Sequence, residues 1–379
     1  LACRKRDVPQ ERIDQLVGRH AERLKPLHGA ALPSPTDERE IIDAPQIGEE
    51  EDGTVNRVPK SFIISIIAPR LEETFELVRV PYPSKFAYLN AFGLPTPFVH
   101  LCNRLFVIQF SSSEGVKTLL VSPSDWEHQR ATPFFAHLDA KAGPLVGVME
   151  ALVLKKTSTV LKCLASIGLR PEDVDYITYD HLHTQNVSRW LGANGQTPIF
   201  PNAKLLVMRE EWESAQALIP WQNQWYCPQG TQGIAPERVE LLDDSVWLGD
   251  GAVALVRTKG HTEGNHSIVA HTGQGLLVTS ENGVSLDAYE PKHSSISGLA
   301  DFAKRTGAEV IINGNTQEYV VDQYISMVQE KSIAGPSPVD DRFPNVVPSS
   351  EAQPYWLFPG TAPTARSGSF EFGRFVASA

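Results

Sequence analysis

From Ser61 onward the chain is a succession of short apolar runs separated by turn residues, which is typical of β-strands. The runs predict strands over 62–68, 98–101, 105–110, 118–121, 173–179, 204–208, 253–258, 267–271, 276–279 and 309–312. Apolar residues at helical spacing predict helices over 158–168, 210–218 and 299–306. Because strands dominate before Ser158 and alternate with helices after it, the pattern indicates a layered α/β fold, with sheets inside and helices outside.

The N-terminal part of the chain differs from this pattern. Residues 1–61 contain no aromatic side chain and are rich in charge, and four prolines lie within 32–59. We therefore expect a charged N-terminal extension, with one amphipathic helix over 12–27. Two interpretations stay open: a solvated extension, and an arm that packs on a partner subunit.

The C-terminal part, residues 331–379, holds seven prolines and seven aromatic side chains. Disordered tails are usually poor in aromatic residues, so we expect this extension to pack on the domain or on a neighbouring subunit. The predicted organisation is an N-terminal extension over 1–61, a domain over 62–330 and a C-terminal extension over 331–379. Through the two extensions, a homo- or hetero-oligomer is predicted.

Composition narrows the classes of function. The 379 residues carry 34 Lys and Arg against 45 Asp and Glu, and this formal charge of −11 argues against a nucleic-acid partner. No apolar run approaches the ~18–20 residues of a membrane span, so no membrane partner and a cytoplasmic location are expected. The four cysteines form no CxxC pair, which excludes a zinc ribbon and a disulfide framework.

The most informative segment follows the strand predicted over 173–179, where residues 180–186 read DHLHTQN. In an extended backbone, side chains at i and i+2 leave on the same side, about 6–7 Å apart. The imidazoles of His181 and His183 can therefore converge on one cation.

Three further strand ends carry polar groups. Residues 258–267 read TKGHTEGNHS, where Gly260 and Gly264 allow a tight turn that presents His261. The strand predicted over 276–279 leads to Glu281, and the strand over 309–312 leads to a polar loop that contains Asn315.

In order and spacing these motifs resemble the metallo-β-lactamase fold superfamily. That family carries His-x-His-x-Asp-His after a strand, then Gly-His-Thr-x-Gly, then an Asp after a strand, and a final His after the last strand. The resemblance covers about residues 103–317. It implies a four-layer αββα sandwich with the site on loops along one edge of the sheets. It also implies metal ligation by His181, His183 and His261, with Glu281 in place of a bridging Asp.

The chain departs from the family where a second metal would bind. Gln185, Asn186 and Asn315 stand in place of one Asp and two His, and amides are much weaker ligands for a divalent cation. We therefore predict one divalent ion, with these three residues lining the substrate pocket. Zn²⁺ fits three histidines and Glu281 best, and Fe²⁺ or Mn²⁺ also suits such a set. Alternatively, Glu281 holds an imidazole N–H instead of the metal.

The usual proton acceptor of the family, the Asp of the first motif, is Gln185 here and cannot take a proton. A substitute base is required. The candidates are Glu281, if it is not bound to metal, and His266 or Glu263 from the glycine-containing segment 258–267. We predict Glu281 and His266 as the catalytic residues.

A cluster of aromatic residues lies where this family places variable segments that cover the substrate. Trp212, Trp221 and Trp225, with Tyr226, predict a pocket for a flat, apolar or aromatic substrate. The alternative is that these side chains only pack a large loop.

The leading hypothesis is a single-metal hydrolase, in which a metal-activated water attacks an electrophilic carbon of a small organic substrate. An ester, a lactone, or an activated aryl ether or halide would fit. Two alternatives stay open: a mononuclear iron enzyme that uses O₂, and a non-catalytic assembly subunit with the same fold.

Overall fold

The computed structural model describes residues 41–44, 56–59, 70–89, 91, 98–143, 147, 150, 154–220, 222–249, 251–315, 318–355, 362–367, 370–372 and 375–376. The helix predicted over 12–27, the strand over 62–68 and the boundary at 61/62 lie outside these residues. The chain divides into two compact units, Leu1–Pro69 with His271–Gly275, and Arg70–Ala270 with Leu276–Ala379. The first unit contains an antiparallel pair, β1 (Ile41–Ala44) and β2 (Asn56–Pro59).

The second unit contains a large mixed sheet with the strand order β6-β3-β4-β5-β7-β8-β9, and β14 pairs with β4. Its strands are β3 (Arg70–Pro83), β4 (Phe98–Ser112), β5 (Gly115–Val121), β6 (Lys155–Lys156), β7 (Tyr176–Thr178), β8 (Lys204–Met208), β9 (Val239–Leu242) and β14 (Ser350–Gln353). Strands β5, β7, β8 and β9 are parallel. Parallel pairing places the C-terminal ends of these strands at one edge of the sheet.

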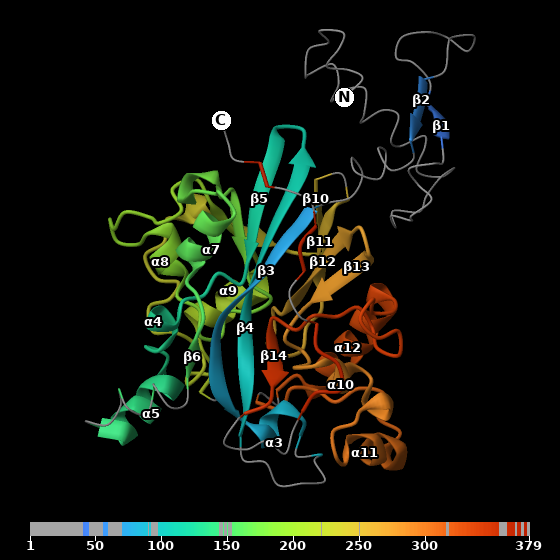
Figure 1. Cartoon of the computed structure of the whole chain (residues 1–379). Coiled ribbons are helices and arrows are strands. Elements are labelled where there is room, and N and C mark those ends of the chain that lie inside the picture. Colours follow the sequence, from blue (N-terminus) through green and yellow to red (C-terminus); the bar gives the residue numbers. More distant parts are fainter. Residues whose placement is uncertain are drawn as a thin grey trace. The chain divides into compact units, whose positions relative to one another are not determined.

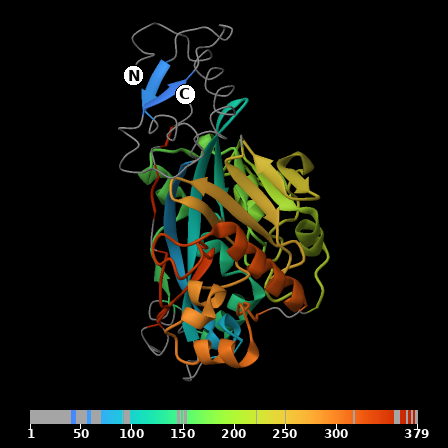
Figure 2. The same ribbon diagram turned by 90° about the vertical axis from the view of Figure 1, so that its right-hand side faces the viewer.

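The smaller sheet has the order β10 (Val246–Leu248), β11 (Val253–Arg257), β12 (His266–Thr272) and β13 (Gly275–Thr279). Figure 1 shows two groups of helices on opposite sides of the sheets. The green group contains α7 (Val160–Ser166) and α8 (Val187–Leu191), and the orange group contains α10 (Leu286–Tyr289), α11 (Leu299–Thr306) and α12 (Val320–Ala334). Helix α9 (Arg209–Gln216) packs against the same apolar cluster as α7 and α8. Figure 2 shows the smaller sheet with α11 and α12 facing the viewer.

The described residues also form α3 (Ser84–Ala87), α4 (Trp126–Gln129) and α5 (Pro133–Ala142), and three short 3-10 helices at Pro171–Asp173, Pro236–Arg238 and Pro291–His293. In the part of the chain that the structure describes, no helix has both the length and the hydrophobicity to cross a membrane.

Apolar residues that alternate along the strands build the layers. On β4, Phe106 belongs to a buried cluster with Leu255 of β11 and so faces the smaller sheet. The next residue, Val107, belongs to the cluster with Val160 of α7 and so faces the helices. Alternate residues of the smaller sheet pack with α10, α11 and α12. Because side chains of a strand alternate between its two faces, this arrangement is the predicted αββα sandwich.

Two segments differ from the predicted elements. Residues 309–312 form no strand: Val310, Ile311 and Ile312 are buried, but the Ile311 N–H donates to the carbonyl of Ala288, in α10, instead of to a strand. Helix α12 was not predicted because its buried face mixes polar residues with apolar ones such as Met327 and Ala334. It buries Gln323, Ser326 and Glu330, whereas two aliphatic side chains, Val321 and Ile325, are exposed.

Part of the C-terminal extension completes the large sheet of its own chain. β14 pairs antiparallel with β4, with Ser350 opposite Asn103. Next to this pair, the buried carboxylate of Glu351 forms an ion pair with the buried guanidinium of Arg104. The predicted packing on a partner subunit stays a prediction.

Candidate metal centre

Two of the predicted ligands follow β7 directly. The strand ends at Thr178, and the chain continues through Tyr179 and Asp180 to His181 and His183. Both histidines are buried, with 4% of their surface exposed. Their ring centroids are 4.8 Å apart, so the two side chains leave this edge of the sheet on the same side.

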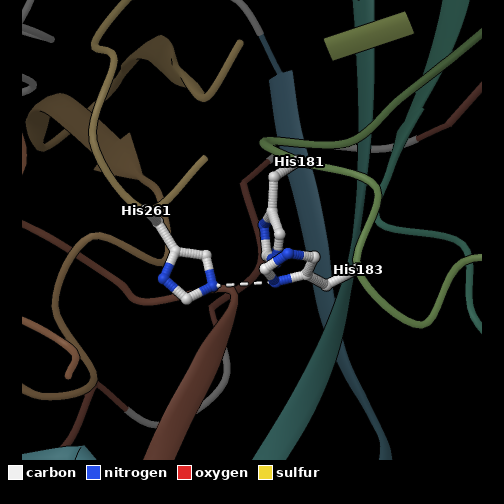
Figure 3. A group of neighbouring side chains, drawn as sticks. All are labelled: His181, His183 and His261. Carbon is white, nitrogen blue, oxygen red and sulfur yellow. Dashed lines mark hydrogen bonds between the residues drawn. The ribbon is translucent and has the colours of Figure 1, made fainter. Parts of the chain in front are cut away.

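The third histidine, His261, lies in the loop between β11 and β12. A Cβ atom at Gly260 would lie 2.4 Å from Cα of Gln323, so this loop approaches α12 more closely than any other residue allows. The N–H of His261 donates to Oδ1 of Asn282 at 2.8 Å. The His261 ring centroid lies 4.5 and 5.0 Å from those of the other two histidines. Figure 3 shows the three rings gathered from two loops.

The three side chains fit a single divalent cation. Each offers one ring nitrogen, and these atoms lie within 4.8 Å of one another. Nδ1 of His183 and Nε2 of His261 are 3.2 Å apart. Two nitrogens that each lie about 2.0–2.1 Å from a tetrahedral Zn²⁺ are about 3.3–3.4 Å apart. The observed separation therefore matches a preformed metal site.

Hydrogen bonds determine which nitrogen of two rings faces this centre. Nε2 of His183 donates to Oε1 of Gln222 at 2.7 Å, which leaves the lone pair on Nδ1. Nδ1 of His181 donates to Oδ1 of Asp180 at 3.1 Å, which leaves the lone pair on Nε2. An acceptor behind a ligating imidazole fixes the ring's orientation and raises its basicity.

Burial keeps two of the three rings neutral. It holds the pKa of His183 and of His261 well below the usual value, and the charge of His181 lowers both further. Neutral imidazole is the form that binds metal ions. For His181, burial also lowers the pKa, but the adjacent Asp180 carboxylate outweighs it and the pKa rises to about 9. A cation at the centre competes with that proton.

A second group of possible ligands shares His181. The ligand atoms of Asp180, His181 and Glu281 lie within 4.8 Å of one another. Oγ of Ser349 lies 2.8 Å from Oδ2 of Asp180 and 3.3 Å from Oε2 of Glu281. Burial raises the pKa of Glu281 to about 7, with the charge of His181 opposing and that of Asp180 adding to the rise. Among the described residues, Glu281 does not form a single such group with all three histidines. Metal ligation by Glu281 therefore stays a prediction.

The three histidines line a cavity of about 60 Å³ with apolar walls. Its polar lining also includes Gln185, Glu281 and Asn315. The apolar walls are formed by Val80, Pro81, Tyr82, Leu101, Phe134, Phe135 and Trp225. A second cavity of about 10 Å³, with room for about one water, is lined by polar residues that include Asp180, Gln185 and Glu281.

Several predicted site residues lie elsewhere. Asn186 lines neither cavity, because its side chain caps α8 by accepting from the N–H of Arg189. Trp212 lies on α9, is half-buried and packs against an apolar cluster that includes residues of α7 and α8, and it lines neither cavity. Trp221 lies outside the described residues, so its place in the pocket stays a prediction.

The predicted catalytic role of His266 also needs correction. His266 is fully buried at the start of β12, and its Nε2 lies 3.1 Å from Oγ1 of Thr178. It lines neither cavity. Burial lowers its pKa to about 4, although Asp180 opposes this shift. The ring is therefore a neutral group inside the sandwich without access to a substrate.

Two residues of the centre were not assigned from the sequence. Asp180 directly precedes His181, and a carboxylate next to a ligating histidine is a signal that could have revealed it. Gln222 lies 39 residues after His183 in an irregular loop, and nothing in the local sequence connects the two.

No family model matches this chain. A curated protein, N-acyl homoserine lactonase AttM of Rhizobium johnstonii, is 26% identical over 182 residues, which are 42% of this chain and 65% of the lactonase. A separate similarity, 49% identity over 59 residues, links 16% of this chain to 13% of the cell division protein FtsA of Rhizobium meliloti. The chain thus spans less than two thirds of the length of each of these curated relatives.

Among solved structures, a probable metal-dependent hydrolase from Staphylococcus aureus is similar over 80% of this chain and 99% of its own, with a TM-score of 0.52 and 11% identity. Identity at this level shows the fold alone. Together with the αββα layers and the three histidines at the sheet edge, this similarity shows that the chain has the fold of the metallo-β-lactamase superfamily.

Proposed function

We propose that this chain is a metal-dependent hydrolase that opens a lactone, or cleaves a related ester, with an apolar substituent. The observation that carries this proposal is the convergence of three buried imidazoles on one cavity with apolar walls. The similarity to a lactonase supports a lactone within this class of substrates.

The histidines His181, His183 and His261 would hold the metal ion. A divalent cation in such a site lowers the pKa of water toward ~7 and polarises a substrate oxygen. Asp180 and Gln222 orient two of the rings from behind. These contacts keep the donor atoms in place before a ligand arrives.

Glu281 is the proposed proton acceptor. It lines the same cavity as the three histidines, and its carboxylate belongs to the group with His181. Gln185, which lines both cavities, is an amide and accepts a hydrogen bond from Ser124, so it cannot take the proton. A carboxylate within reach of the attacking water is what general-base catalysis requires.

We further propose that the centre holds one metal ion. Gln185 and Asn315 line the cavity as neutral amides, and Asn186 is used as a helix cap. A set of amides without the Asp and the two histidines of the family is a poor second site. Zn²⁺ is the favoured ion because of the nitrogen-rich, near-tetrahedral separation of the donors.

The substrate's apolar part would lie against Phe134, Phe135 and Trp225. The rings of Phe134 and Trp225 are in contact, tilted by 32° with centroids 4.9 Å apart, and both line the cavity. Such walls bury apolar substituents, whereas the polar groups at the metal centre orient the reacting carbonyl.

The test is hydrolysis by the full chain, purified and analysed for metal. A panel of N-acyl homoserine lactones, simple lactones and aryl esters is assayed for the wild type and for His261→Ala. We expect His261→Ala to lose bound metal and turnover, whereas His293→Ala, at an exposed histidine that lines neither cavity, keeps both. Full metal content and full turnover in His261→Ala would refute the proposal.

A further inference from the structure

Glu211 is a fully buried carboxylate in the first turn of α9 that the proposed chemistry does not use. It lines neither cavity, so it does not contact a substrate there. A buried charge is unfavourable unless several hydrogen-bond donors compensate for it. The donors to this carboxylate therefore identify the segments that Glu211 connects.

The carboxylate accepts three hydrogen bonds from three different segments. Oε1 accepts from the N–H of Leu182 at 2.7 Å and from the hydroxyl of Tyr226 at 2.9 Å. Oε2 accepts from Oγ1 of Thr262 at 2.5 Å. Hydrogen bonds to a charged acceptor are about twice as strong as neutral ones, so this group links the segments firmly.

Each of these donors is adjacent to a histidine of the metal centre. Leu182 lies between His181 and His183, and Thr262 directly follows His261. Tyr226 forms a β-bridge with His183, and the centroids of their rings are 4.9 Å apart. One carboxylate therefore connects both loops that bring the three imidazoles together.

The loop between β11 and β12, which contains His261 and Gly264, is also packed directly on Glu211. A Cβ atom at Gly264 would lie 2.1 Å from the backbone nitrogen of Glu211 and 2.4 Å from its Cβ. Only glycine permits this approach, which brings Thr262 within reach of the carboxylate. Glu211 thus contacts this loop both through packing against Gly264 and through the hydrogen bond from Thr262.

We propose that Glu211 is the positioning residue of the metal centre, holding the segment 181–183 and the loop of His261 in register so that the three imidazoles bind one cation. This inference rests on the proposed function, because it assumes that the histidines bind metal. Residues that support metal ligands without touching the ion typically contribute 10–100-fold to affinity.

The test is a titration of the metal-free full chain with Co²⁺ against a competing chelator, monitored by visible absorption. Glu211→Gln keeps the shape of the side chain but turns one acceptor into a donor. We expect Co²⁺ affinity to fall about 10–100-fold and the absorption spectrum of bound Co²⁺ to change.

The matched control is Asp287→Asn. Asp287 is also a fully buried carboxylate near the start of a helix, and it accepts hydrogen bonds from Ser294 and Thr364. It lines neither cavity. We expect this variant to lose stability but to bind Co²⁺ with the wild-type affinity and spectrum, which separates positioning from general stability.

Two milder variants keep the inference testable if Glu211→Gln does not fold. Tyr226→Phe and Thr262→Val each remove one donor to the carboxylate, and we expect each to weaken Co²⁺ binding by less than Glu211→Gln does. Wild-type affinity and spectrum in Glu211→Gln, or in both milder variants, would overturn the inference. A wild-type chain that binds no Co²⁺ would instead refute the proposed function.

Discussion

Nε2 of His183 donates to Oε1 of Gln222 at 2.7 Å, and Nδ1 of the same ring lies 3.2 Å from Nε2 of His261. The first contact places the proton of the neutral ring on the side away from His261. The lone pair of Nδ1 consequently points to the place where a cation would lie. Gln222 lines neither cavity, yet its hydrogen bond selects the tautomer of His183, one of the proposed metal ligands.

Replacing Gln222 tests this relationship. Gln222→Leu removes the acceptor, so the ring of His183 is free to turn and its tautomer is no longer selected. We expect metal affinity to fall by about tenfold or more, measured by competition with a chelator. Gln216→Leu, at an exposed glutamine of α9, should have no effect. Equal affinity in the wild type and Gln222→Leu would show that the hydrogen bond is not needed.

The metal content of the purified chain should be one equivalent. The three histidines supply one site, and the amides of Gln185 and Asn315 do not replace the anionic and imidazole ligands of a second. Elemental analysis after dialysis against metal-free buffer gives both the element and its stoichiometry. Two tightly held equivalents would contradict the single-ion prediction, and none would favour a non-catalytic subunit.

The apolar wall of the cavity should control substrate preference. Phe134→Ala removes a half-buried ring that contacts the ring of Trp225. We expect KM to rise about tenfold, or about 1.4 kcal/mol, for substrates with large apolar substituents, with a smaller change for unsubstituted lactones. Trp247→Ala removes an exposed ring of β10 that lines neither cavity and should leave KM unchanged. Identical KM values for all substrates in Phe134→Ala would exclude this wall from binding.

The buried ion pair between Arg104 and Glu351 connects the C-terminal extension to β4. Glu351→Ala leaves the guanidinium buried without this carboxylate, so we expect the free energy of unfolding to fall by about 3–5 kcal/mol. The double variant Arg104→Met with Glu351→Met should recover much of that loss, because two apolar side chains need no charge compensation. Urea unfolding measures all three proteins. A loss well under ~1 kcal/mol in Glu351→Ala would show that the pair contributes little.

Glu330 should make stability depend on pH. It is buried on α12 and accepts hydrogen bonds from Ser267, Asn282 and Tyr289. Burial raises its pKa above the usual value of 4.5, although these hydrogen bonds oppose the shift. The folded chain therefore keeps this proton at a pH where the unfolded chain has lost it. The corresponding stabilisation is full below the unfolded pKa and disappears as pH rises through the folded pKa.

The measurement compares the metal-free wild type with Glu330→Gln, which does not titrate. We expect the free energy of unfolding of the wild type, relative to the variant, to fall as pH rises from about 4.5 through the folded pKa and then to level off. A difference that stays constant with pH, or that increases, would contradict this assignment.

The sequence by itself determined the layers and the three imidazoles. Alternation of apolar residues is local, so strands such as β8 and helices such as α11 were predicted with their observed bounds. His181 and His183 follow one strand, and His261 lies between glycines, so their motifs are readable within a few residues. Strand direction then places those motifs at one edge of a sandwich.

Only the tertiary structure decided which residues support the ligands. Gln222, Glu211 and Glu330 meet their partners through contacts between segments distant in sequence, and no local period encodes such contacts. The same holds for His266, whose position in a motif suggested chemistry but whose ring lies inside the sandwich. The pattern of apolar and polar residues predicts the fold because it depends on neighbouring residues. The contacts of a buried side chain depend instead on how whole layers pack together, so the local sequence does not reveal them.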